Sequence, residues 1–185
     1  MNMMKYAAEI LEELGRSVEQ IAEPEAETFA DAILQKHKVF VAGAGRSGLM
    51  GRTFAMRLMQ LGVNAYVVGD TVTPSIGKDD VLMIGTGSGE TKSLIPVVQK
   101  AKSLGASVIA VTTAPESMIG KLADTLVKLP GTPKDQQDGG HSTIQPMASL
   151  FEQTLLIFYD AVILRMMELT GQDTATMYER HANLE

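Results

Sequence analysis

The chain has 185 residues, of which 16 are Lys or Arg and 22 are Asp or Glu, giving a formal net charge of -6. This length suits one domain with a substantial core, and a net negative surface without a Lys/Arg cluster disfavours nucleic acid as a partner. The absence of cysteine excludes disulfides and thiol chemistry, and acidic residues near the N-terminus and in the most apolar segment argue against a secretory signal or membrane span, so we expect a cytoplasmic protein.

Two helices are predicted at the start of the chain, and short apolar runs follow them. Apolar residues recur three and four positions apart between 3 and 21, which is typical of an amphipathic helix, and Pro24 starts the second helix of a pair within residues 3–37. Five later runs, mostly rich in Val and Ile, show little alternation and therefore predict parallel strands buried on both faces. These strands are expected at residues 39–42, 65–68, 81–84, 108–111 and 126–129.

Helical stretches separate the predicted strands, and a long helix follows the last of them. The helices are expected at residues 47–61, 91–104, 116–122 and 145–169. This alternation predicts the α/β class, with a doubly wound, parallel five-stranded sheet flanked by helices in a three-layer, flavodoxin-like sandwich. We interpret residues 1–185 as one domain, whose last long helix is apolar on nearly every face and lies in the core or against another subunit. The long polar connection at 130–141 is of a kind that is often functional or mobile.

The first of two glycine-rich loops, residues 43–48 (GAGRSG), follows a predicted strand and satisfies the pattern G-x-G-x-x-G. That pattern occurs in dinucleotide-binding folds, and Asp70 is a candidate for the acidic residue that such a site needs. A dehydrogenase also requires a substrate domain, for which 185 residues leave no room. We therefore favour a different role, in which Arg46 and Ser47 lie beside the second loop at the carboxyl ends of neighbouring strands.

The second loop, residues 85–91 (GTGSGET), combines three glycines with three hydroxyl side chains ahead of a predicted helix. Glycines let the backbone approach a ligand, hydroxyls donate hydrogen bonds, and a helix N-terminus contributes partial positive charge. This chemistry suits a phosphate monoester held without a metal, and the lysine that marks a nucleoside triphosphate loop is missing. The residues assigned to the phosphate are Thr86, Gly87, Ser88, Gly89, Glu90 and Thr91. A tight turn with Thr91 as helix N-cap is the structural alternative.

Two further residues are candidates for proton transfer. Glu152 lies in the most apolar helix, where a carboxylate is paired, at an interface or retained for proton transfer, and position alone favours a structural role. His181 lies in a terminal segment of a kind that ordinarily frays, so its position alone favours disorder. No two of the three histidines have the spacing of metal ligands, and we expect neither a metal nor another cofactor.

Together these features resemble the sugar isomerase (SIS) domain family, and within it the 6-phospho-3-hexuloisomerases. The resemblance covers essentially the whole chain and includes the initial helical pair. It is carried by both glycine-rich loops, by the segments 145–147 (QPM) and 151–152 (FE), and by the ending 181–185 (HANLE). It implies that Ser47 and the second loop hold a phosphate, that Glu152 is the base, and that His181 serves the reacting oxygens.

The resemblance also implies a reaction and partners. The carbonyl of an open-chain sugar phosphate would move from C3 to C2, converting D-arabino-3-hexulose 6-phosphate to fructose 6-phosphate through a cis-enediol. Functional coupling to hexulose-phosphate synthase, in the ribulose monophosphate route for formaldehyde, is implied as well, as is a homotetramer or dimer of dimers with active sites near subunit boundaries. Two alternatives stay open: another phosphosugar isomerase, or a non-catalytic sugar-phosphate-binding module.

Overall fold

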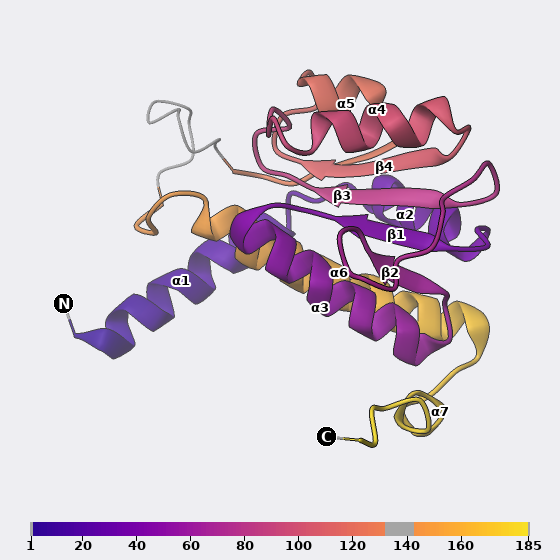
Figure 1. The fold of residues 1–185 in the computed structure, drawn as a ribbon. Coiled ribbons are helices and arrows are strands. Elements are labelled where there is room, and N and C mark those ends of the chain that lie inside the picture. Colours follow the sequence, from indigo (N-terminus) through magenta and orange to yellow (C-terminus); the bar gives the residue numbers. More distant parts are fainter. Residues whose placement is uncertain (1, 132–142, 185) are drawn as a thin grey trace.

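Five parallel strands form the central sheet of the computed structural model, which describes residues 2–131 and 143–184 (Figure 1). The strands are β1 (Val39–Ala42), β2 (Ala65–Val67), β3 (Val81–Gly85), β4 (Ser107–Thr112) and β5 (Thr125–Lys128). Their order in the sheet is β2-β1-β3-β4-β5, so the winding of the chain reverses between β1 and β3. The predicted parallel five-stranded α/β fold is confirmed, and each predicted strand ends within one residue of the observed bounds.

Helices cover both faces of this sheet, which gives three layers (Figure 1). The helices on one face are α2 (Glu23–Leu34), α3 (Gly45–Leu61) and α6 (Ser149–Thr170), and those on the other are α4 (Ile95–Ser103) and α5 (Met118–Leu122). Successive residues of β1 enter opposite layers: Val41 packs with α3 and α6, and Phe40 packs with α4. Because both faces of β1, β3 and β4 are buried, these strands consist mostly of apolar residues and show little alternation in the sequence.

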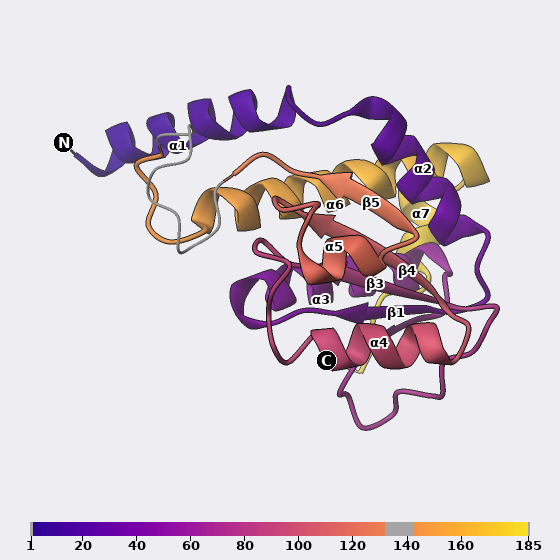
Figure 2. The ribbon, with the colours of Figure 1, turned by 90° about the horizontal axis from the view of Figure 1, so that it is seen from above.

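The terminal helices lie outside these layers. Helix α1 (Met3–Val18) extends past the sheet, and its buried residues, Glu13, Leu14 and Ser17, all lie in its second half (Figures 1 and 2). The short α7 (Thr174–Tyr178) lies beside the end of α3, where Arg180 Nη1 donates a hydrogen bond to the Gln60 carbonyl oxygen at 3.2 Å. None of the helices in the described chain is long and apolar enough to cross a membrane.

Helices α4 and α6 begin four residues later than the sequence predicts, and α5 begins two residues later, at Met118 rather than at residue 116. Helix α4 begins at Ile95 rather than at residue 91, because residues 92–94 form a turn in which the amides of Leu94 and Ile95 donate to the Thr91 carbonyl oxygen. Helix α6 begins at Ser149 rather than at residue 145, after a bend that holds Met147 at a left-handed φ of 59°. Most of the polar connection predicted at 130–141 lies outside the described residues.

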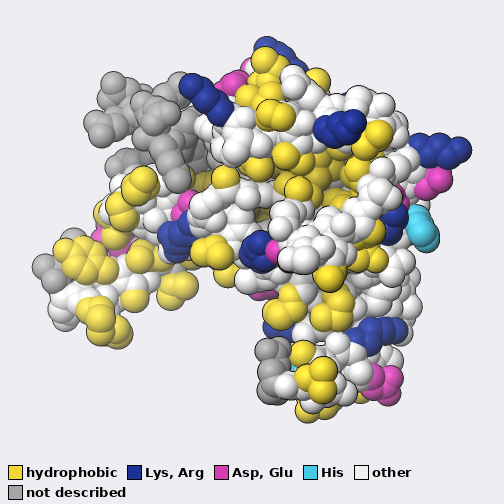
Figure 3. Space-filling view, viewed as in Figure 1, with side chains coloured by type: hydrophobic (Ala, Val, Ile, Leu, Met, Phe, Trp, Pro, Cys, Tyr) yellow, Lys and Arg dark blue, Asp and Glu magenta, His cyan; other side chains and the backbone are white. Residues whose placement is uncertain are grey.

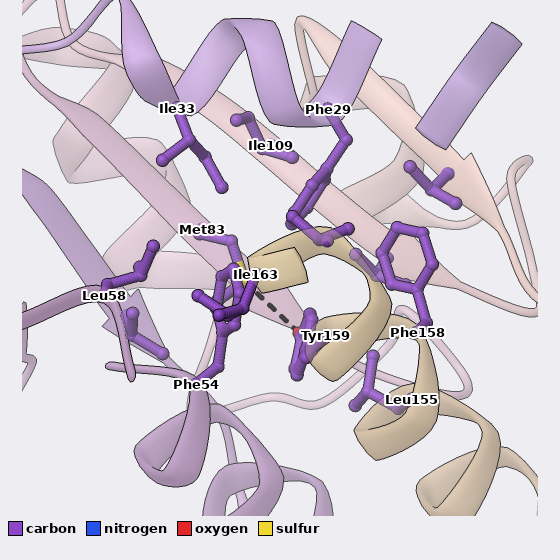
Figure 4. Packing of buried hydrophobic residues seen from close by; sticks show 14 of the residues in the cluster. Phe29, Ile33, Phe54, Leu58, Met83, Ile109, Leu155, Phe158, Tyr159 and Ile163 are labelled. Atoms are coloured by element: carbon purple, nitrogen blue, oxygen red, sulfur yellow. Dashed lines mark hydrogen bonds between the residues drawn. The ribbon is translucent and has the colours of Figure 1, made fainter. Parts of the chain in front are cut away.

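The close approach of α6 to β3 links the core to the end of that strand (Figure 4). Tyr159 of α6 is fully buried, stacks on Phe54 with ring centroids 4.4 Å apart, and donates a hydrogen bond to Met83 Sδ at 3.3 Å. Burial raises the pKa of this phenol, which therefore remains a neutral donor. A Cβ on Gly85 would lie 2.8 Å from both Tyr159 Oη and Leu155 Cδ2. Only glycine therefore lets α6 pack directly against the last residue of β3.

Candidate active site

The carboxyl ends of β1 and β3 lie side by side at the centre of the sheet. Ala42 is in register with Ile84, so the loops that follow the two strands start at the same edge. In doubly wound sheets this point, where the winding reverses, is where ligands bind. The two loops border a cavity of about 260 Å³. Its lining residues are Ala44, Gly45, Ser47, Gly85, Thr86, Gly87, Ser88, Thr91, Leu94 and Ala148.

The first loop uses its glycines for close packing. A Cβ on Gly43 would lie 2.7 Å from the Cα of Gly48, so the end of β1 and the first turn of α3 touch through bare backbone. This contact turns the chain directly from strand to helix and places Ser47 at the cavity. Asp70, the candidate acidic residue of a dinucleotide site, is instead paired with Arg52 at 2.9 Å. The G-x-G-x-x-G pattern thus has a packing explanation that needs no dinucleotide.

Residues 86–91, which we call the hydroxyl loop, are held in place by the end of β4. The carbonyl oxygen of Gly87 accepts hydrogen bonds from the hydroxyls of Thr112 and Thr113 at 3.0 and 2.8 Å and from the Thr113 amide at 3.2 Å. Gly89 has a left-handed φ of 64°, and a Cβ there would overlap the side chain of Ser117. Contacts with the rest of the fold therefore fix the shape of this loop.

Three hydroxyl side chains of this loop line the cavity. Thr86 Oγ1 accepts a hydrogen bond from the Gly89 amide at 3.3 Å and lies 3.5 Å from Thr91 Oγ1, and Ser88 Oγ accepts from the Glu90 amide at 3.2 Å. A hydroxyl that accepts in this way can still donate its proton to a ligand. Thr91 is not the N-cap of α4, because that helix begins four residues later, so the structural alternative for this hydroxyl is wrong.

Glu90 differs from the other side chains of the hydroxyl loop. Its carboxylate accepts a hydrogen bond from the Met118 amide at 2.7 Å, at the start of α5, and the residue does not line the cavity. In this structure Glu90 therefore links the hydroxyl loop to α5 by a hydrogen bond and does not face the cavity where an anion would bind.

Glu152 lies in the first turn of α6 and is only 3% exposed. Nη1 of Arg46 lies 3.3 Å from Glu152 Oε2 and also donates a hydrogen bond to Ser149 Oγ at 2.9 Å. Both residues of the ion pair are close in sequence to cavity-lining ones, since Arg46 lies between Gly45 and Ser47 and α6 starts directly after Ala148. The fold thus brings a buried carboxylate, a guanidinium and a hydroxyl-lined cavity together.

Ser149 and Ala148 are site residues that the sequence analysis missed. Ser149 accepts the hydrogen bond from Arg46, and Ala148 forms part of the cavity wall. The sequence feature that could have identified them is their position just before Glu152, in the first turn of a predicted helix.

His181 lies far from this cavity within the same chain. Its neighbour Arg180 is bonded to Gln60 near the end of α3, whereas the cavity lies at the start of that helix. With 17 residues, α3 is about 25 Å long at 1.5 Å per residue. His181 is exposed, stacks beside Tyr178 with ring centroids 5.9 Å apart, and lines a groove between α3, α6 and α7. A chain does not bring its own His181 to its own Glu152.

In residues 2–131 and 143–184, no three His, Asp or Glu side chains are grouped as metal ligands would be. The side chains that the fold brings together at the candidate site are hydroxyls, a guanidinium and a carboxylate.

Comparison with known proteins places this fold and site in a family. The model of the SIS domain matches residues 32–163, which include β1 to β5, both glycine-rich loops and Glu152. The chain belongs to the SIS domain family.

Its relatives within that family include named isomerases. The chain is 57% identical, over 185 residues and 100% of both chains, to the 3-hexulose-6-phosphate isomerase of Bacillus subtilis strain 168. It is 39% identical over 176 residues, 95% of this chain and 88% of the other, to the 3-hexulose-6-phosphate isomerase of Mycobacterium gastri. A crystal structure from Methanococcus jannaschii, described as inferring the same molecular function, superposes with a TM-score of 0.81 at 36% identity and covers 97% of each chain.

Proposed function

We propose that this chain is a phosphosugar isomerase that interconverts D-arabino-3-hexulose 6-phosphate and fructose 6-phosphate. The full-length identity of 57% to a 3-hexulose-6-phosphate isomerase supports the reaction. The structural observation that carries the proposal is the position of the buried Glu152, paired with the exposed Arg46, beside the hydroxyl-lined cavity. An anion-binding pocket next to a carboxylate that can accept a proton is the minimum that this chemistry requires.

In this proposal the hydroxyl loop binds the phosphate. Ser47, Thr86, Ser88 and Thr91 donate hydroxyl protons to its oxygens, and the bare backbone of the loop glycines lets the anion approach closely. Arg46 adds positive charge at the neighbouring position. Because β4 already holds the loop, little ordering would accompany binding.

Glu152 then acts at C2 of the sugar. Its carboxylate takes the proton from C2, the electrons of that C–H bond form the C2=C3 double bond, and the C3 carbonyl oxygen gains a proton to give the cis-enediol. Return of the proton to C3 and loss of the proton from O2 complete fructose 6-phosphate, with atoms and electrons conserved. Arg46, bonded to one carboxylate oxygen, orients Glu152 for this transfer. The 3-ketone with a phosphorylated O6 cannot close a five- or six-membered ring, so no ring-opening step is needed in this direction.

The group that moves protons between the two oxygens is proposed to be His181 of a neighbouring chain. Exposed apolar side chains on both terminal segments support assembly, and they include Met3, Met4, Leu11 and Tyr178 (Figure 3). A homotetramer built partly on these helices would let the tail of one chain reach the cavity of another. In the cell the enzyme would act in the cytoplasm and use the product of hexulose-phosphate synthase.

The test is a coupled assay with purified protein. Ribulose 5-phosphate, formaldehyde and hexulose-phosphate synthase generate the substrate, and fructose 6-phosphate is detected only if the chain isomerises it. Omitting the synthase is the control for contaminating activities. Turnover of arabinose 5-phosphate without turnover of the hexulose would show a different phosphosugar isomerase. Binding of fructose 6-phosphate with no turnover and no exchange of its C2 proton would show a non-catalytic module.

A further inference from the structure

Glu13 on α1 is buried although it carries a charge. The residue is 5% exposed, and its Oε2 accepts hydrogen bonds from Thr143 Oγ1 at 2.7 Å and from Gln145 Nε2 at 2.9 Å. Its Oε1 accepts from the Ile144 amide at 2.8 Å. Gln145 is itself only 7% exposed. Since charged groups are seldom buried without such partners, three converging donors mark this as a specific contact.

The same donors keep Glu13 in its charged form. Burial raises the pKa of this carboxyl, but the hydrogen bonds from Gln145, Thr143 and Ile144, together with the charge of Arg16, hold the pKa below its usual value. At neutral pH Glu13 is therefore charged, and both of its carboxylate oxygens accept hydrogen bonds.

The segment that Glu13 holds leads directly into the candidate active site. Within the described residues, every hydrogen bond from residues 143–148 to a distant element ends on Glu13. Figure 2 shows this orange segment beside α1, just before α6. It ends at Ala148 in the cavity wall, and the first turn of α6 with Glu152 follows. It also contains Met147 in a left-handed conformation, a strain that persists only when neighbouring contacts enforce it.

We propose that Glu13 is a positioning residue for the active site. By holding residues 143–145 against α1, it fixes the cavity wall at Ala148 and the first turn of α6, and so sets the position of Glu152 relative to Arg46. This inference rests on the proposed function, because the geometry that it concerns is that of the proposed base. It also gives a role to the QPM segment at 145–147, to which the reaction itself assigns none.

Removal of the carboxylate tests this role, with a neighbouring glutamate as control. Glu13→Ala should lower kcat by roughly 10- to 100-fold, the cost of a misplaced catalytic group, while KM changes much less because β4 holds the hydroxyl loop independently. Hydrogen exchange across residues 143–150 should become faster. Glu12→Ala, an exposed change on the same helix, should leave both measurements unchanged.

A conservative variant separates hydrogen bonding from charge. In Glu13→Gln the remaining oxygen can still accept from Ile144, and a turned Gln145 amide can accept from the new amide, so kcat should recover to within a few-fold of wild type. A Glu13→Gln enzyme as slow as Glu13→Ala would assign the effect to charge and overturn the proposal. Folded Glu13→Ala with wild-type kcat, or a loss shared equally by Glu12→Ala, would overturn it too.

A milder variant decides the question if Glu13→Ala does not fold. Gln145→Met keeps the size of the buried side chain and removes one of the three donors, so kcat should fall about 3- to 10-fold. Unchanged kcat in this variant would overturn the proposal. A wild-type protein without hexulose phosphate isomerase activity would instead refute the proposed function, whereas active wild type with equally active Glu13→Ala refutes this inference alone.

Discussion

The two ends of α6 differ in the proposed site residues that lie beside them within one chain. At its first turn, Glu152 is 3% exposed, is paired with Arg46 and lies beside a cavity whose loop is already anchored by β4. Toward its other end, His181 lies exposed on a groove beside the five-residue α7. One chain thus places the carboxylate and the hydroxyls of the proposed site together, whereas under the proposed function the histidine comes from another chain. The two parts should therefore respond differently to mutation and to mixing of chains.

The largest effect is expected at the Glu152 end of α6. Glu152→Gln keeps the size of the side chain but cannot accept the C2 proton, so turnover should fall by at least about 10²-fold while fructose 6-phosphate still binds. Exchange of the C2 proton with deuterated water, followed by NMR, measures this step directly. Asp160→Asn makes the same chemical change at an exposed position of the same helix and should leave exchange intact. Undiminished exchange in the Gln variant would make Glu152 structural.

A somewhat smaller loss is expected at the other end. His181→Ala should reduce turnover by roughly 10- to 100-fold, because a positioned acid–base group is lost. His37→Ala, a change of an exposed histidine that precedes β1, should have no effect. Co-assembled His181→Ala and Glu152→Gln chains should regain part of the activity, since some sites combine both intact residues. Mixed oligomers without any recovery would place base and tail in the same chain, and full activity of His181→Ala would remove the histidine from the mechanism.

A binding effect without a large effect on turnover is expected in the hydroxyl loop. Ser88→Ala removes one donor to a charged phosphate, worth about 1.5–3 kcal/mol, so KM should rise roughly 10- to 100-fold. Steady-state kinetics with fructose 6-phosphate measure the change. Ser103→Ala, which removes a hydroxyl that donates to the Lys100 carbonyl oxygen at the end of α4, serves as the matched control. An unchanged KM would mean that the phosphate binds elsewhere.

The smallest effect concerns stability at the bend before α6. Met147 is 76% exposed and has a left-handed φ, so Met147→Gly removes strain and little packing and should change the free energy of unfolding by no more than about 1 kcal/mol, in the stabilising direction. Leu164→Gly, also exposed but inside α6, should destabilise by about 1 kcal/mol. Urea denaturation measures the free energy of unfolding of both variants. A Met147→Gly protein less stable than wild type would show that the left-handed conformation of Met147 is not strained.

The sequence predicted those parts of the fold that depend on local pattern. Buried apolar runs mark the five strands, and the hydroxyls of Thr86, Ser88 and Thr91 are visible as chemistry within a single loop. The predicted start of α4 was wrong, because helix propensity does not show that residues 92–94 form a separate turn that is hydrogen-bonded to the Thr91 carbonyl oxygen.

Contacts between distant segments could not be predicted in this way. Arg46 and Glu152 are 106 positions apart, and Glu13 and Gln145 are 132 apart, so neither pair has a local signature. Position alone made Glu152 ambiguous, and only the fold shows the cation beside it. For His181, position suggested disorder and resemblance suggested a role, and the structure places it at the far end of α3 from its own cavity.

The bare backbone contact at Gly85 has a consequence for how substrates would be told apart. Gly85 has no side chain, so Leu155 and Tyr159 of α6 pack directly on the main chain at the end of β3, and this packing sets the spacing between the proposed phosphate site and Glu152. Under the proposed function, this fixed distance between the phosphate site and the base selects substrates by the number of carbons between the phosphate and the reacting carbon. In a hexulose 6-phosphate the reacting C2 is four carbons from the phosphorylated carbon, whereas in a pentose 5-phosphate it is three. A shorter sugar would stop one carbon short of the base, and chain length alone would then exclude it.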